Sequence, residues 1–176
     1  MNIPTLKIAR CGHALAPMMA KHFGRWWWAW ALILIAGGQI GSRWALHVNL
    51  SHSITECDVF LVTKADRQIA RGSLVEFAWP GGGPYPAGVR FIKIVKGMPG
   101  DIVTTQGRDY FINGVYVGTA KFSSARGEVL EMGPTGRIPP GRFFVWTPHP
   151  DSLDSRYALT GWVNYGQVVG TARKLF

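Results

Sequence analysis

Short apolar segments separated by glycine- and proline-rich turns make up the chain from His47 onwards. Such runs, four to eight residues long and rich in β-branched and aromatic residues, are typical of strands. We therefore expect strands at Val59–Thr63, Leu74–Ala78, Val89–Val95, Ile102–Thr105, Tyr110–Ile112, Arg142–Trp146 and Gln167–Ala172. Asn113-Gly114 predicts a tight hairpin turn within residues 109–118. No long helical period follows residue 50, so residues 47–176 are predicted to form one mainly β domain with a coiled or barrel-like sheet.

The pattern before this domain is different. Residues 26–42 form an uncharged run of seventeen residues, and roughly 17–25 suffice to cross a bilayer core. Tryptophans at 26, 27, 28 and 30 suit one membrane interface, and Trp44 suits the other. We expect a transmembrane anchor at residues 26–44. A cleaved signal peptide or a buried core helix would also carry an apolar run, but four clustered tryptophans fit a retained anchor better.

The distribution of charge supports this arrangement. The chain carries a formal net charge of +9, yet its first 46 residues contain five Lys and Arg residues and no acidic ones. Basic residues accumulate on the cytoplasmic side of membrane spans. We therefore expect residues 1–25 in the cytoplasm and residues 47–176 outside the inner membrane of a bacterium, with the lipid bilayer as a partner. No nucleic-acid-binding motif accompanies the basic excess. Cys11 and Cys57 would lie on opposite sides of the membrane and could not pair.

One lysine of the sequence stands in an apolar setting. Side chains of a strand alternate between its two faces, so the expected strand 89–95 places Lys93 on one face with Val89, Phe91 and Val95. Burial there would lower the pKa of the ammonium and let Lys93 act as a base near neutral pH. Lys96 shares the other face with Arg90. Alternatively, Lys93 could extend from an edge strand to water.

Several boxes resemble bacterial signal peptidase I, in consistent order from Leu50 to Phe176. Residues 91–101, Phe-Ile-Lys-Ile-Val-Lys-Gly-Met-Pro-Gly-Asp, are similar to its lysine box, and residues 151–157, Asp-Ser-Leu-Asp-Ser-Arg-Tyr, to its last conserved box. Ser51-His52-Ser53 follows the expected span, where that family keeps its nucleophile. Residues 138–144 and 112–114 resemble further strand and hairpin boxes. The resemblance implies a signal-peptidase-like β domain and a serine endopeptidase that acts on a protein precursor.

By this resemblance Ser53 is the nucleophile and Lys93 its general base. Ser51 is the hydroxyl that would stabilise the oxyanion together with the backbone N–H of Ser53. A serine requires such a neutral base within hydrogen-bond reach, and a Ser-Lys pair is a recognised variant of the serine triad. The resemblance implies no metal and no organic cofactor.

The last box supplies the supporting residues that the resemblance implies. Ser152 matches a serine that orients the lysine, and Asp154 and Arg156 match an acidic and basic pair. The chain departs from signal peptidase I in having Ile54 after the serine and Trp-Thr-Pro-His-Pro at 146–150. Both features are closer to the TraF-type peptidases of conjugal transfer systems, which mature pilin precursors and in some systems cyclise them. In that branch an aspartate near the last box is catalytic, so the role of Asp154 stays open between support and participation.

Other assignments compete with this one. His52 would point away from Ser53 on an extended segment, whereas His149 could serve as the base of a Ser/His enzyme. Cys57 is a possible nucleophile, but nothing around it indicates a lowered pKa. A general signal peptidase and a non-catalytic β module of a secretion or conjugation complex remain alternative functions.

Overall fold

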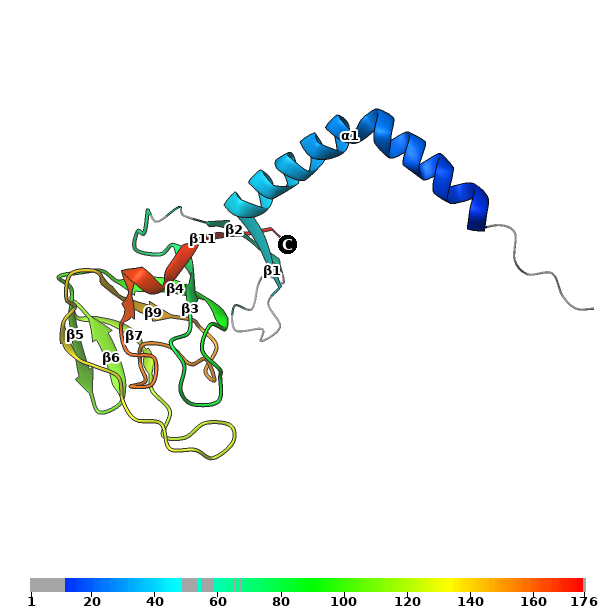
Figure 1. Ribbon diagram of the computed structural model, residues 1–176. Helices are drawn as coiled ribbons and strands as arrows, with labels where there is room; N and C mark the ends of the chain where they lie inside the picture. The colour runs from blue at the N-terminus through cyan, green and yellow to red at the C-terminus, as the bar shows by residue number, and fades with distance from the viewer. Residues whose placement is uncertain (1–11, 49–53, 55–58, 65, 67, 176) are drawn as a thin grey trace, which may run out of the picture. The chain divides into compact units, whose positions relative to one another are not determined.

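The computed structural model describes residues 12–48, 54, 59–64, 66 and 68–175, and for residues 12–23 it describes the backbone alone. The chain divides into two compact units, residues 1–42 and residues 43–176. The described part of the first unit is helical, and the second unit contains the strands (Figure 1).

Helix α1 (Gly12–Arg43) bends at Trp26, whose φ of −115° and ψ of 18° depart from helical values. After the bend the helix exposes many large apolar side chains: Trp27, Trp28, Trp30, Leu32, Ile33, Leu34, Ile35 and Ile40. Arg43 occupies the last turn, where a cation interacts favourably with the helix dipole.

The structure does not support the transmembrane helix expected at residues 26–44. Within the described part of the chain, no helix combines the length and the apolar character that crossing a membrane requires. The tryptophans, the glycines and Gln39 lower the mean hydropathy of the uncharged run. The helix ends at Arg43, and Trp44 begins strand β1 (Trp44–Val48).

The second unit contains two antiparallel sheets. The larger sheet has seven strands in the order β1-β2-β11-β3-β4-β9-β10, and the smaller sheet has four in the order β7-β6-β5-β8. The further strands of the larger sheet are β2 (Val59–Lys64), β3 (Leu74–Ala78), β4 (Arg90–Gly97), β9 (Arg142–Trp146), β10 (Val163–Asn164) and β11 (Val168–Lys174). The smaller sheet consists of β5 (Ile102–Gln106), β6 (Asp109–Ile112), β7 (Val115–Thr119) and β8 (Gly136–Arg137), and a short 3₁₀ helix, η1 (Tyr165–Gln167), precedes β11.

The mainly β prediction is confirmed, and all seven expected strands form with ends shifted by at most a few residues. The hairpin is also confirmed, because Ile112 pairs with Val115 across a two-residue turn. Asn113 and Gly114 have φ angles of 50° and 81°, the left-handed values that such a turn requires. The sequence pattern misses β1, β8 and β10. The latter two have only two residues each, too few to show alternation.

Strand β4 lies between β3 and β9 in the larger sheet, and both of its faces are covered. Val95 packs on one face with residues that include Val75, Phe77 and Val145. Ile92 packs on the other face in a separate cluster with Ile54 and Phe60. A polar side chain in the middle of β4 is therefore removed from water, and this property positions the candidate site.

Candidate active site

Lys93 lies in the middle of β4 with only 3% of its surface exposed. Phe91 and Val95, two residues away on either side, belong to the same apolar cluster, so the prediction that Lys93 faces the core is confirmed. Lys96 instead lies over the ring of Trp146, with 4.8 Å from Nζ to the ring centre. The position of Lys93 in a central strand excludes the alternative in which it extends from a sheet edge to water.

Burial lowers the pKa of Lys93 from its usual value near 10.5 to about 8. The negative charge of Asp154 opposes this shift, and the positive charge of Arg156 adds to it. Because the two charges act in opposite directions, desolvation governs the result. A substantial fraction of Lys93 is neutral slightly above physiological pH and can accept a proton.

Ser152 is the hydrogen-bond partner of Lys93, whose Nζ donates to Ser152 Oγ. Ser152 is itself buried and lies in the loop that follows β9. Its backbone N–H donates to the carbonyl of His149 at 3.1 Å, which closes a turn in that loop. The structure thus brings together two residues that lie 59 positions apart in the sequence.

Asp154 and Arg156 form a two-pronged ion pair directly after Ser152. Arg156 Nε donates to Asp154 Oδ1 at 2.9 Å, and Nη2 donates to Oδ2 at 2.8 Å. Backbone N–H groups of Arg156 and Thr147 also donate to this carboxylate. Burial by itself would lower the pKa of Arg156, but the hydrogen bond and the charge of Asp154 outweigh burial and raise it.

The ion pair also connects this loop to the smaller sheet. Arg156 Nη1 donates to the carbonyl of Thr119, the last residue of β7, at 2.9 Å. Ser155 and Val145 exchange two hydrogen bonds, one from each backbone N–H, at 3.0 and 2.9 Å. The loop that carries Ser152 is therefore held on both sides and keeps the hydroxyl against Lys93.

Thr147 belongs to this region and was not singled out from the sequence. It is fully buried, and its hydroxyl has no hydrogen-bond partner among the described residues. Ile94 of β4 pairs with Trp146 of β9 in antiparallel register. Continuing this register by one residue leads to Lys93, which precedes Ile94, and to Thr147, which follows Trp146. Alternation from the buried Phe143 and Val145 was the signal that could have placed Thr147 on the buried face.

The expected nucleophile Ser53 and its helper Ser51 lie outside the described residues, as do His52 and Cys57. Ile54, directly after Ser53, is described and buried, and it packs in the same cluster as Ile92, the residue before Lys93. His149 Nδ1 accepts a hydrogen bond from the backbone N–H of Asp151 at 3.2 Å, so this nitrogen is engaged within its own loop. Among the described residues, no group of three or more His, Cys, Asp or Glu side chains is arranged to hold a metal ion.

Comparison with known proteins places these features in context. Residues 25–176 match a family model described as signal peptidase, peptidase S26. Among solved structures, the chain is similar to a signal peptidase I from Enterococcus faecalis at 26% identity and a TM-score of 0.41, over 61% of this chain and 98% of that one. The curated proteins contain no match.

The buried lysine predicts a specific dependence of stability on pH. Between pH 8 and 10 the unfolded chain still holds a proton on Lys93 that the folded chain has released, so the free energy of unfolding rises with pH. Relative to Lys93→Met, the wild type should gain up to about 1.4 kcal/mol per pH unit in this window. Chemical denaturation at several pH values measures the difference. Lys96→Met is the matched control and should follow the wild type, whereas a Lys93→Met curve parallel to the wild type would contradict the lowered pKa.

Proposed function

This chain belongs to the peptidase S26 family of signal peptidases, and from that membership we propose that it removes a leader or propeptide from a translocated precursor with a Ser53–Lys93 pair. The family establishes a serine-type peptidase that acts on a protein precursor. The observation that carries the assignment of the base is the burial of Lys93 together with its lowered pKa. A neutral amine is the form that can activate a serine hydroxyl.

In the proposed mechanism, neutral Lys93 takes the proton of Ser53 as its Oγ attacks the scissile carbonyl. The hydroxyl of Ser51 and the backbone N–H of Ser53 donate to the oxyanion of the tetrahedral intermediate. The protonated Lys93 then gives its proton to the leaving amine, and an acyl-enzyme remains on Ser53. Lys93 next activates a water molecule, which hydrolyses the ester and regenerates the serine.

Ser152 and the Asp154–Arg156 pair act as positioning residues in this proposal. Ser152 Oγ holds Nζ in one orientation, so the lone pair of the neutral amine is available to Ser53. Both oxygens of Asp154 are engaged by Arg156 and by backbone N–H groups, which favours a supporting role over direct proton transfer. The charge of Asp154 raises the pKa of Lys93 and the charge of Arg156 lowers it, so the two charges act on Lys93 in opposite directions.

We further propose a conjugative pilin as the precursor. The support is the Ser53-Ile54 sequence and the segment Trp-Thr-Pro-His-Pro at 146–150, which resemble the TraF-type branch more than general signal peptidases. Cyclisation of the pilin would require that an amine displaces water at the acyl-enzyme. General removal of signal peptides is the second candidate, and it follows from the family match alone.

The proposed site of action is the outer side of a bacterial inner membrane, with other conjugation or secretion components nearby. Support comes from the basic residues of the N-terminal region and from the exposed tryptophans and aliphatic side chains of α1, which suit contact with lipid.

A protease added to spheroplasts should digest a C-terminal epitope of this protein while a cytoplasmic control protein stays intact. Digestion that requires lysis would contradict this location.

Alanine substitutions test the catalytic pair. Ser53→Ala and Lys93→Ala should each lower cleavage of a co-expressed pilin precursor by roughly 10⁴-fold or more, because the nucleophile and its base act as a unit. Precursor size on electrophoresis is the measurement, and His52→Ala and Lys96→Ala are the matched controls that should retain cleavage. With purified enzyme, kcat/KM should rise as pH increases through about 8, as Lys93 loses its proton. Normal maturation of the precursor in both alanine variants would refute the assignment of Ser53 and Lys93 as nucleophile and base.

The role of Asp154 can be separated from its contribution to stability. Asp154→Asn leaves a buried guanidinium without its counterion and should cost about 3–5 kcal/mol. The double variant Asp154→Leu with Arg156→Met removes both charges and should recover most of the stability and of the cleavage rate. Denaturation and cleavage are measured on the same preparations. A double variant that is stable and inactive would show that the pair contributes to the reaction beyond its effect on stability.

A further inference from the structure

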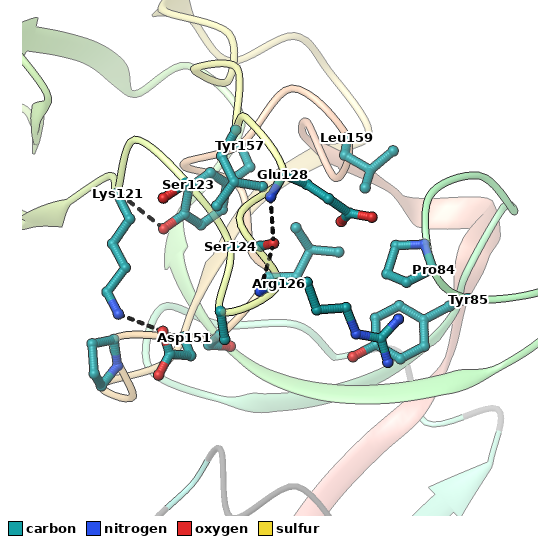
Figure 2. Close-up of a pocket in the computed structure, with 15 residues that line it drawn as sticks. Pro84, Tyr85, Lys121, Ser123, Ser124, Arg126, Glu128, Asp151, Tyr157 and Leu159 are labelled. Carbon is teal, nitrogen blue, oxygen red and sulfur yellow. Dashed lines mark hydrogen bonds and ion pairs between the residues drawn. The ribbon is translucent and has the colours of Figure 1, made fainter.

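A pocket lies next to the Lys93–Ser152 contact. Its cavity volume is about 210 Å³, smaller than the roughly 300–1,000 Å³ of sites for whole small molecules. Its apolar and aromatic walls are Pro84, Tyr85, Leu130, Leu153, Tyr157 and Leu159. Figure 2 shows Pro84, Tyr85 and Leu159 on one side of this space and Lys121 and Asp151 on the other. The size and the walls suit one large side chain.

The pocket is continuous with the candidate active site through Ser152. Ser152 lines the pocket, and its Oγ also accepts the hydrogen bond from Lys93 Nζ. A general base must lie within hydrogen-bond reach of the serine it activates, so the scissile bond lies near Nζ. An extended peptide advances roughly 3.3 Å per residue, and the pocket begins at Ser152, so a residue a few positions from the scissile bond can reach it.

The charges around the pocket cancel. Lys121 forms an ion pair with Asp151, and Arg126 and Glu128 add one charge of each sign. A charged side chain would therefore gain no net attraction and would lose hydration on entering the apolar space. An uncharged apolar side chain gains from burial against the same walls.

The pocket is pre-formed because backbone contacts fix the loop that borders it. Ser123 pairs with Val129, and the N–H of Ser124 donates to the carbonyl of Glu128, so residues 123–129 form a small hairpin. Arg108 donates from its guanidinium to the carbonyls at 120, 121 and 130. The hydroxyl of Tyr157 accepts from the N–H of Lys121 at 3.1 Å. Binding a side chain here does not require the loop to fold first.

We propose that this pocket is a specificity site that binds one large apolar side chain, such as Leu, Phe or Met, of the precursor within a few residues of the scissile bond. The proposal rests on the proposed peptidase function and adds a requirement on the substrate. It separates the precursors of this enzyme from those that carry small or charged residues at that position. Its determinants lie within residues 84–85, 121–130 and 150–159.

A matched pair of tryptophan substitutions tests the pocket. Ala125 lines it and is exposed, so Ala125→Trp should obstruct the space without disturbing the core. Val129→Trp is the control, because Val129 lies in the same loop, is 84% exposed and does not line the pocket. Thermal unfolding of both variants checks that the fold is retained. The full chain is incubated with a peptide library from a bacterial proteome, and mass spectrometry identifies the peptides that wild type cleaves and Ser53→Ala does not.

The cleaved peptides should contain large apolar residues at one fixed position within about four residues of the bond. For a peptide pair that differs by Phe or Ala at that position, wild type and Val129→Trp should prefer Phe by about tenfold or more in kcat/KM. Ala125→Trp should lose this preference through KM, with an unchanged pH profile. No enrichment of large apolar residues, or an Ala125→Trp enzyme that keeps the preference, would overturn the pocket assignment alone. No cleavage by wild type beyond Ser53→Ala would overturn the peptidase proposal together with it.

Discussion

Desolvation of a single amine is the constraint on which the candidate site depends. Lys93 occupies a central strand whose two faces are both packed, and only 3% of its surface is exposed to water. The folded state tolerates this loss of hydration because Ser152 supplies a neutral hydrogen-bond partner for the amine. The hydroxyl satisfies the nitrogen without stabilising its charged form. A carboxylate at position 152 would have stabilised the ammonium and removed its basicity. A hydroxyl satisfies the nitrogen and keeps the pKa low.

The Asp154–Arg156 pair holds the loop of Ser152 without placing a net charge beside Lys93. A lone aspartate would raise the pKa of Lys93, and a lone arginine would lower it further. The two-pronged geometry keeps both charges together and directs Nη1 of Arg156 to the carbonyl of Thr119. The same contacts therefore set both the geometry and the electrostatics around Lys93.

Local patterns allowed the strands and the buried lysine to be predicted. Alternation in residues 89–96 distinguished Lys93 from Lys96, and Asn113-Gly114 specified the hairpin, because both signals depend on neighbouring residues only. The contact between Lys93 and Ser152 was available only by resemblance, since it joins positions 59 residues apart. Strand β1 was missed because Trp44 was assigned to the expected membrane anchor and only four residues of the strand follow it. The pocket was missed because loops that are distant in sequence build it.

Arg108 fixes the pocket loop through three carbonyl groups of the main chain, and its guanidinium also lies over the ring of Phe122, 4.5 Å from the ring centre. Carbonyl oxygens are present whichever amino acids occupy positions 120, 121 and 130, so these three hydrogen bonds do not depend on the side chains there. Substitutions there can alter which precursors are selected while the loop keeps its path and Lys93 keeps its surroundings. In evolutionary terms, recognition at the proposed specificity site and chemistry at Lys93 are separable, and a change of precursor can be met by replacing a few exposed loop residues.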